Sequence, residues 1–479
     1  MSAHEAGALH APGYGGVAVV PSWLGPPSTA YELLPQLWAG SVHRNKDGAL
    51  QVGGVDVRDL AREYGTPAYI LDETDFRARA QAFHDAFRYA FDDLGGADVY
   101  YAGKAFLCTE VARWMAEDGL RLDTCSGGEL TVALRAGVPP ESIGLHGNNK
   151  SDAELDKALR TGIGRIVVDS LAEIDRVADA AGRLGVLAPV LLRVTVGVEA
   201  HTHEYIATAH EDQKFGVSLA AGVAFEAVQR IFARPELSLR GLHSHIGSQI
   251  FDTHAFEVAA RRVLGLHARV MKDFGVALPE LDLGGGFGIA YTSEHDPLEP
   301  KALADSLAEI VRRECRSLGV EVPRVSVEPG RAIAGPSTFT LYEAGTIKDV
   351  FLDHGTTRRY VSVDGGMSDN IRTALYDADY SCALASRISS AAPVLTRIVG
   401  RHCESGDILV KDEFLPSDVK AGDLLAVPGT GAYCRSMASQ YNHTPRPPVI
   451  AVRDQAARLL VRRETEDDLL ALDVLCGAG

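Results

Sequence analysis

Lys104 stands at the end of the stretch YYAGKAF, directly after an apolar run that predicts a buried strand. A lysine in this position is expected to extend into a desolvated pocket, where its neutral amine is favoured and can form an imine with a carbonyl. Lysine in a loop is more often an exposed surface residue. Lys104 is therefore a candidate catalytic residue only because other reactive groups are expected near it.

A glycine-rich turn and a neighbouring arginine indicate an anion site. Gly286 belongs to DLGGGFG and lets the backbone approach a ligand closely, and Gly330 and Arg331 follow in EPGRA. Backbone N–H groups in such turns bind phosphate, and Arg331 could also clamp a carboxylate with two hydrogen bonds. The spacing in GGGFG does not match the GxGxxG fingerprint, so a dinucleotide site is not indicated.

Three further polar residues follow apolar runs in the same way. Glu328 ends RVSVE and could keep the ring nitrogen of a pyridine cofactor protonated. In HSHIGSQ, His245 could stack on an aromatic ring and Ser248 could donate to a phosphate. Taken singly, Glu328 fits an ion pair or a helix cap, and His245 fits a core histidine.

The elements that must position these groups alternate between strand and helix. Eight β-rich runs, each followed by a helical stretch, begin near residues 98, 120, 143, 165, 190, 241, 279 and 324. This alternation predicts a parallel sheet, and the count and length match a (β/α)8 barrel. In such a barrel the active site lies at the carboxyl ends of the strands, where the residues above fall. An open doubly wound sheet is the alternative arrangement.

The chain beyond residue 335 has a different texture, with strand-like runs separated by Gly, Asp and Pro turns. It predicts an antiparallel β-sandwich or barrel-like domain. The expected domain organisation has four segments: an N-terminal extension at 1–30, an N-terminal part of the β domain at 31–65, the cofactor-binding barrel at 66–335 and the C-terminal β domain at 336–479.

The β domain carries its own candidate groups. Cys403 and Glu404 are adjacent in HCESGD, and Tyr433 sits in the glycine-flanked turn GTGAYC. Arg372 and Tyr376 are four residues apart in SDNIRTALY, which places them on one face if that segment is helical. Each of these residues alone is more often structural than catalytic.

Composition limits the class of protein. The chain has 479 residues and a net charge of −17, which disfavours nucleic acid and anionic membranes as partners. Its seven cysteines form no CxxC pair, so we expect no metal site and no disulfide framework. We see neither a signal peptide nor an apolar run long enough to cross a membrane, and we expect a cytoplasmic location.

Ten motifs in order resemble one family, the fold-type III pyridoxal-phosphate-dependent decarboxylases, and among them the diaminopimelate decarboxylases. The resemblance covers roughly residues 50–475 and rests on YYAGKAF, DTCSGGEL, HGNNKS, GVEAHTHEYIATAHEDQKFG, GLHSHIGSQI, DLGGGFG, EPGRAIAG, SVDGGMSDNIRTALY, RHCESGD and GTGAY. It implies pyridoxal 5'-phosphate as cofactor and conversion of meso-2,6-diaminopimelate to L-lysine and CO2. It also implies a homodimer with active sites at the interface.

The resemblance further implies roles for individual residues. Lys104 would hold the cofactor as a Schiff base, His245 would stack on its ring, and Glu328 would face the ring nitrogen. Cys403 would come from the partner subunit and deliver a proton, a role that Lys104 could also fill. The phosphate would be held by Ser248, Gly286, Gly330, Arg331 and Tyr433. The distal end of the substrate would be held by Arg331, Arg372, Tyr376, Glu404 and Tyr433.

The arginines favour diaminopimelate over simpler substrates. Ornithine and arginine have no distal carboxylate and would leave Arg331 and Arg372 without their partner, at a cost of kilocalories. The main alternative is nevertheless a decarboxylase of ornithine, arginine or a carboxylated polyamine on the same fold. A racemase, a non-catalytic homologue and a sugar-phosphate barrel enzyme each account for fewer of the motifs.

Overall fold

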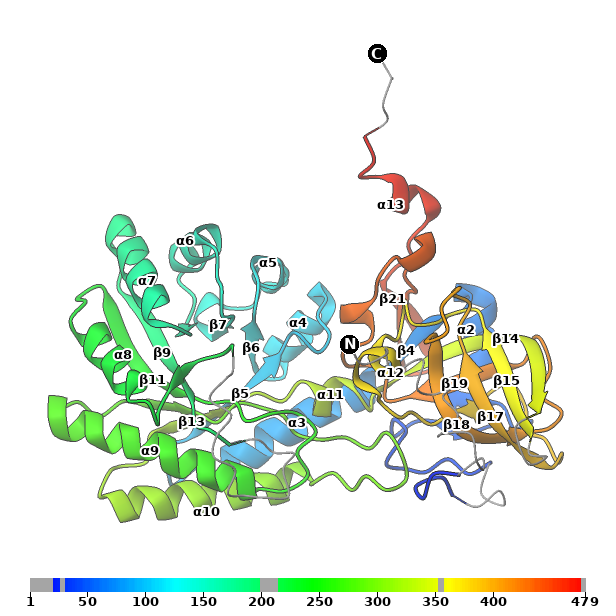
Figure 1. Cartoon of the computed structure of the whole chain (residues 1–479), viewed down its shortest axis with the longest axis horizontal. Helices are drawn as coiled ribbons and strands as arrows, with labels where there is room; N and C mark the ends of the chain where they lie inside the picture. The colour runs from blue at the N-terminus through cyan, green and yellow to red at the C-terminus, as the bar shows by residue number, and fades with distance from the viewer. Residues whose placement is uncertain (1–19, 26–30, 199–213, 352–356, 475–479) are drawn as a thin grey trace. The chain divides into compact units, whose positions relative to one another are not determined.

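The protein is represented by a computed structural model that describes residues 20–25, 31–198, 214–351 and 357–474 (Figure 1). The chain divides into two compact units. We call residues 77–288 and 297–333 the barrel unit, and residues 1–76, 289–296 and 334–479 the sheet unit. None of the helices in the described ranges is long and apolar enough to cross a membrane. Most of the expected extension at 1–30 lies outside the described residues.

The barrel unit contains a closed ring of eight parallel strands. Neighbouring strands pair in the order β9-β11-β12-β13-β5-β6-β7-β8, and a pairing between β8 and β9 closes the ring. The ring confirms the predicted (β/α)8 barrel and excludes the open sheet. The strands are β5 (Ala97–Ala102), β6 (Arg121–Thr124), β7 (Ile143–Leu145), β8 (Arg165–Val168), β9 (Ala188–Thr195), β11 (Leu237–His243), β12 (Glu280–Asp282) and β13 (Arg324–Val327). A short strand, β10 (Val217–Ser218), pairs with β9.

Helices surround this ring on its outer side (Figure 1). They are α3 (Glu73–Ala90), α4 (Thr109–Glu117), α5 (Gly127–Arg135), α6 (Asp152–Thr161), α7 (Leu171–Leu184), α8 (Val223–Phe232), α9 (His254–Phe274) and α10 (Pro300–Leu318), and a short helix, α11 (Arg331–Ala334), follows β13. Their inward faces are buried and apolar, so the hydrophobic effect fixes them against the strands.

Serine and glycine define where several of these helices begin and end. Ser126, Ser151 and Ser170 cap α5, α6 and α7, each accepting a hydrogen bond from a first-turn backbone N–H. Gly162 and Gly185 end α6 and α7 in the left-handed conformation that glycine adopts without strain. Because each serine follows the carboxyl end of a strand closely, the caps fix the short loops that form the mouth of the barrel.

The sheet unit is built on a mixed sheet in the order β18-β17-β15-β14-β4-β20-β21; β19 also pairs with β14, and β16 pairs with β19. Most pairs are antiparallel, but β15–β17 and β4–β20 are parallel, so the expected purely antiparallel domain is corrected to a mixed one. The strands are β4 (Ala68–Asp72), β14 (Thr338–Phe351), β15 (Thr357–Val363), β16 (Ala383–Leu384), β17 (Pro393–Val399), β18 (Ile408–Pro416), β19 (Leu424–Pro428), β20 (Val449–Arg453) and β21 (Ala456–Val461).

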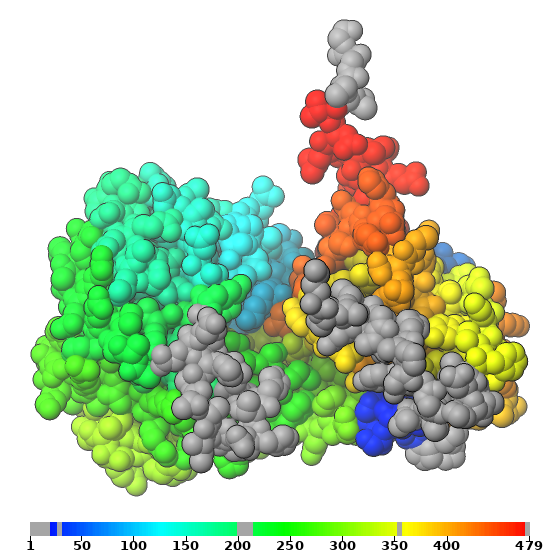
Figure 2. All heavy atoms as spheres, viewed as in Figure 1, coloured from blue at the N-terminus to red at the C-terminus, as the bar shows by residue number. Residues whose placement is uncertain are grey.

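The N-terminal part of the sheet unit adds a small sheet to this core. It comprises β1 (His43–Arg44), β2 (Leu50–Val52) and β3 (Val55–Asp56), followed by α2 (Val57–Tyr64). Leu50 and Val52 share one buried cluster with Phe339 and Ile450 of the large sheet. Two short helices complete the unit, α12 (Arg372–Tyr376) and α13 (Glu466–Leu470), and α13 projects from its own unit (Figure 2).

Candidate active site

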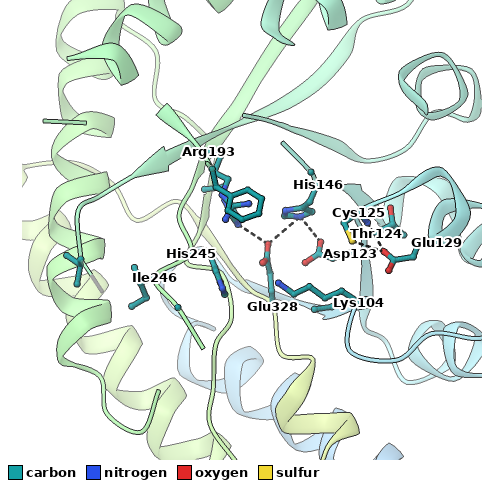
Figure 3. Close-up of a pocket in the computed structure, with 17 residues that line it drawn as sticks. Lys104, Asp123, Thr124, Cys125, Glu129, His146, Arg193, His245, Ile246 and Glu328 are labelled. Carbon is teal, nitrogen blue, oxygen red and sulfur yellow. Dashed lines mark hydrogen bonds and ion pairs between the residues drawn. The ribbon is translucent and has the colours of Figure 1, made fainter. Parts of the chain in front are cut away.

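A cavity of about 480 Å³ opens at the carboxyl ends of the barrel strands (Figure 3). All of its lining belongs to the barrel unit, so its geometry is set within one compact body. Its polar and ionisable lining residues are Lys104, Asp123, Thr124, Cys125, Glu129, His146, Arg193, His243, His245 and Glu328. Three of the residues predicted from sequence, Lys104, His245 and Glu328, are therefore brought together.

Lys104 follows β5 and extends into the cavity toward Glu328 (Figure 3). Its side chain is exposed within the open cavity, so the expected desolvation of this lysine is corrected. The residues around the lysine, rather than burial of the lysine itself, make this position distinctive. Ala102 and Gly103 precede it on the same wall, and their small size leaves room for a ligand.

Glu328 directly follows β13 and lies almost fully buried beneath the cavity. Its Oε1 is 3.2 Å from His243 Nε2 and 3.4 Å from His146 Nε2, yet neither contact has hydrogen-bond geometry. Among the described residues Oε1 has no hydrogen-bond donor. A buried carboxylate without a donor is costly unless a ligand supplies the partner. Glu328 is thus suited to pair with a cationic or N–H group of a bound ring.

The nearby histidines are neutral at physiological pH. Burial lowers the pKa of His146 to about 4, against the opposing effect of Glu328. Burial also holds the pKa values of His243 and His245 well below their usual value. Burial raises the pKa of Asp123 to about 7, with Arg165 opposing the shift, and burial likewise raises the pKa of Glu328. Titratable groups with strongly shifted pKa values in one cleft are typical of functional sites.

The glycine-rich turn after β12 packs against both neighbouring loops without room for side chains. A Cβ on Gly285 would lie 2.1 Å from the carbonyl oxygen of Glu328, and one on Gly286 would lie 2.3 Å from that of Gly247. Gly286 also has φ +104°, a region that favours glycine. Gly330 is also packed too closely for a side chain, because a Cβ there would lie 2.9 Å from Ala102. These contacts explain why the sequence has glycine at these positions.

A hydrogen bond joins two of the predicted phosphate residues across separate loops. Arg331 Nη2 donates to Ser248 Oγ over 2.8 Å, and Arg331 is largely buried. Ser248 is followed by Gln249, which has φ 58°, and the backbone N–H of Ile250 donates to the carbonyl of Gly286. The loops after β11, β12 and β13 are therefore joined to one another by hydrogen bonds. Of these loops the cavity is lined by His245, Ile246, Gly247 and Glu328, and not by Ser248, Gly286, Gly330 or Arg331.

The remaining predicted residues belong to the sheet unit, and none of them lines the cavity. Arg372 begins α12, and its guanidinium lies 5.4 to 5.7 Å from the ring centres of Tyr291, Tyr376 and Tyr433. Tyr433 has φ 60°, a strained conformation for a residue with a side chain. The structure thus groups Arg372, Tyr376 and Tyr433 around one cation.

Cys403 and Glu404 lie exposed on the HCESGD turn between β17 and β18. Asp407 fixes this turn to the loop before α12 by accepting hydrogen bonds from the backbone N–H groups of Met367 and His402, over 2.6 and 2.7 Å. His402 also bonds Ser368 Oγ through Nε2 over 2.8 Å. The turn that carries Cys403 and Glu404 is therefore attached to the segment that leads to Arg372.

Sequence reasoning missed several residues of the cavity. Asp123 and His146 lie in motifs that were recognised, DTCSGGEL and HGNNK, but received no role. Arg193 was overlooked inside the apolar run VLLRVTV, although a lone arginine in a buried strand was a usable signal. Phe215 lies in the recognised motif GVEAHTHEYIATAHEDQKFG but received no role.

The cavity fits a phosphorylated pyridine aldehyde. It offers an exposed amine at Lys104 and a buried carboxylate oxygen of Glu328 without a donor. Its lining residue Gly247 packs against Gly286, and next to Gly247 in the same loop Ser248 accepts a hydrogen bond from Arg331. These features match the three parts of pyridoxal 5'-phosphate, which are its carbonyl, its ring nitrogen and its phosphate.

Family models match most of the chain. Residues 74–335 match the pyridoxal-binding domain of the pyridoxal-dependent decarboxylases. Residues 337–431 match the C-terminal sheet domain of the same decarboxylases. The first range contains the whole cavity, and the second contains Arg372, Tyr376, Cys403 and Glu404.

Curated relatives and solved structures agree with these matches. Diaminopimelate decarboxylase of Mycobacterium tuberculosis is 55% identical over 92% of this chain and 98% of its own length, and that of Mycobacterium leprae is 54% identical over 99% and 100%. The crystal structure of the M. jannaschii enzyme with L-lysine superposes with a TM-score of 0.85 at 31% identity, covering 92% of this chain and 99% of that chain. The chain belongs to the diaminopimelate decarboxylase family of pyridoxal-phosphate-dependent enzymes.

Proposed function

We propose that this chain converts meso-2,6-diaminopimelate to L-lysine and CO2, the last step of lysine biosynthesis. The observation that carries the proposal is the pairing, in one cavity, of the exposed amine of Lys104 with the buried, donor-free oxygen of Glu328. High identity to curated diaminopimelate decarboxylases over nearly the whole chain supports the choice of reaction.

The cofactor of this family is pyridoxal 5'-phosphate, which supplies an electron sink for the bond to the departing carboxylate. Lys104 is proposed to bind its carbonyl and Glu328 to pair with its ring nitrogen. His245 lines the cavity, is partly exposed there and is neutral, and it is proposed to contact the ring face. Its phosphate is proposed to bind Ser248, Gly286, Gly330, Arg331 and Tyr433.

The sheet unit is proposed to bind the distal end of the substrate. That end carries an ammonium and a carboxylate, so it needs partners of both signs. Arg372, held among three tyrosine rings, suits the carboxylate, and Glu404 on the exposed HCESGD turn suits the ammonium. Arg331, Tyr376 and Tyr433 are proposed to complete this group.

Proton delivery is proposed to need a second subunit. Cys403 lies exposed on its turn, where a thiol can reach a ligand outside its own unit. We infer that the protein is a homodimer in which Cys403 of each chain donates a proton at the other chain's site. A cytoplasmic location is inferred as well, since none of the six cysteines within the described ranges is in a disulfide.

Product analysis tests the reaction and the substrate together. Purified protein with pyridoxal phosphate is incubated separately with meso-diaminopimelate, ornithine and arginine, and the amino acids and amines formed are measured. We expect L-lysine from the first substrate and a rate at least about 100-fold lower with the others, because they leave Arg372 unpaired. Product from ornithine or arginine alone would overturn the proposed substrate while leaving the cofactor chemistry in place.

A further inference from the structure

Arg165 is a fully buried arginine in the floor of the barrel. It is the first residue of β8, and its side chain is 2% exposed. Its Nη2 lies 2.5 Å from Asp282 Oδ2, and its Nη1 donates to Ser326 Oγ over 2.9 Å. The guanidinium also lies 3.6 Å from the centre of the Tyr100 ring. Residues of β5, β8, β12 and β13 therefore hold this cation in one position.

The same guanidinium faces the floor of the active-site cavity. Its Nη2 is 3.8 Å from Asp123 Oδ1 and 4.0 Å from Glu328 Oε1. Three buried carboxyl groups thus share one permanent positive charge. No other lysine or arginine of the described ranges has an ion pair with Glu328 within 4.0 Å.

The other charged groups around Glu328 do not replace this cation. The two carboxyl groups, Asp123 and Asp282, disfavour a negative charge on Glu328, and the buried imidazoles are neutral at pH 7. Burial and then Asp123 raise the pKa of Glu328, whereas His146, Arg165 and Lys104 lower it. Within the described part of the barrel unit, the titratable and charged groups around Glu328 are Lys104 after β5, Asp123 on β6, His146 after β7, Arg165 on β8, Arg193 on β9, His243 and His245 at the end of β11, and Asp282 on β12.

We propose that Arg165 is a positioning residue for the cofactor, which keeps Glu328 ionised from beneath so that Glu328 can pair with the protonated ring nitrogen. The proposal rests on the proposed function, because it needs a pyridine nitrogen above Glu328. A carboxylate in a dry site takes up a proton readily unless a fixed cation compensates it. Arg165 supplies that cation without occupying the cavity, since it approaches Glu328 from the barrel interior.

A purely structural role for the Arg165–Asp282 ion pair is the competing explanation. Replacing Arg165 alone leaves Asp282 buried and unpaired, which destabilises a protein whatever the arginine does for Glu328. The decisive comparison is therefore between Asp282→Asn and the double variant Arg165→Met/Asp282→Asn. These two proteins differ only at Arg165, and neither carries an unpaired Asp282.

The measurement is the dissociation constant of pyridoxal phosphate from the full-length, cofactor-free chain between pH 5.5 and 8.5. Thermal unfolding of each variant checks that it is folded. Protonation of Glu328 removes the partner of the ring nitrogen, so affinity falls on the acidic side. We expect this fall to occur about one pH unit higher in the double variant than in Asp282→Asn, which makes binding about tenfold weaker near pH 6. At pH 8.5 the two should agree within about threefold.

Two further variants complete the test. Arg324→Gln is the control and removes another arginine of the barrel floor, which pairs with Asp98. Asp98 still has Arg121 at 3.3 Å in this variant, so the pH profile should not change. Arg165→Lys keeps a positive charge with shorter reach and should shift the profile less than the double variant does. The proposal is overturned if cofactor affinity falls at the same pH in the folded double variant as in Asp282→Asn. If that variant does not fold, the same comparison is made with Arg165→Gln/Asp282→Asn, which also removes the charge, and an unchanged profile in that protein overturns the proposal. Failure of the unaltered chain to bind the cofactor at any pH would instead refute the proposed function.

Discussion

Buried acids occur in the sheet unit as well as beneath the cavity, and Asp369 is a clear case. Its carboxylate accepts hydrogen bonds from Tyr342 Oη and from the backbone N–H of Gly366, the latter over 2.8 Å. Burial raises the pKa of Asp369 to about 7, although these hydrogen bonds oppose the shift. Because the folded chain holds this proton more tightly than the unfolded chain, Asp369 lowers stability as the pH rises from about 4 to about 7.

Asp369→Asn should therefore stabilise the protein at alkaline pH. Asparagine can keep both hydrogen bonds, since its amide can donate to Tyr342 and its oxygen can accept from Gly366. At pH 8 we expect a gain of roughly 2–4 kcal/mol, and near pH 5, where Asp369 is already protonated, little difference. Unfolding of both proteins at the two pH values measures this. Equal stability of variant and parent at pH 8 would refute a buried ionised Asp369.

For single residues, the sequence predicts which side chains share the pocket better than it predicts how buried each one is. Lys104, His245 and Glu328 were placed in one pocket because each follows an apolar strand, and the cavity confirms that grouping. The desolvation of Lys104 was wrongly expected, because burial depends on how loops from other strands enclose the pocket. The ion pairs of Arg165 could not be predicted for the same reason, because its partners lie on or directly after other strands, β6, β12 and β13.

Among the elements, the glycine-rich loop after β12 determines how closely three loops approach one another. Gly286→Ala places a Cβ 2.3 Å from the Gly247 oxygen and forces φ +104° on an alanine. We expect the loop to shift and pyridoxal phosphate to bind at least about tenfold more weakly, while the barrel stays folded. Cofactor titration and circular dichroism of the variant test this.

A matched control lies in helix α9. Gly265→Ala adds a methyl group where no atom lies within 4 Å, and it should leave cofactor affinity unchanged. If Gly286→Ala bound the cofactor as tightly as Gly265→Ala, the loop would not form the anion site.

The alternation of strands and helices made the barrel predictable, because each βα unit has a local hydrophobic period and several helices also begin at a capping serine. The mixed order of the large sheet was not predictable in this way. The parallel pairs β15–β17 and β4–β20 join segments that are distant in sequence or separated by other elements, and short runs of β-prone residues do not encode their partners.

At the level of the whole molecule, each subunit is proposed to contribute its Cys403 to the active site of the other, so activity requires the dimer. Lys104→Ala should be inactive, and Cys403→Ala should be slowed by about 100-fold or more through loss of its acid. After the two variants are mixed and allowed to exchange subunits, half of the dimers are hybrids with one intact site. We expect recovery of about a quarter of the activity of the parent protein.

Size-exclusion chromatography of the mixture confirms that dimers are present. Recovery requires that Lys104 and Cys403 of one site come from different chains. Mixing without any recovery, while dimers exchange, would assign both residues to the same chain and refute the shared site.

Lys104 is the residue proposed to hold the cofactor, and the attachment can be located directly. Borohydride reduction of the protein loaded with pyridoxal phosphate fixes the cofactor to its lysine, and peptide mass analysis locates it. We predict the added mass on Lys104 alone, in the peptide that contains YYAGKAF. Lys150 provides an internal comparison, because it is buried in the same barrel unit and paired with Glu173 at 3.0 Å. Added mass on Lys150 or on another lysine, with Lys104 unmodified, would contradict the account.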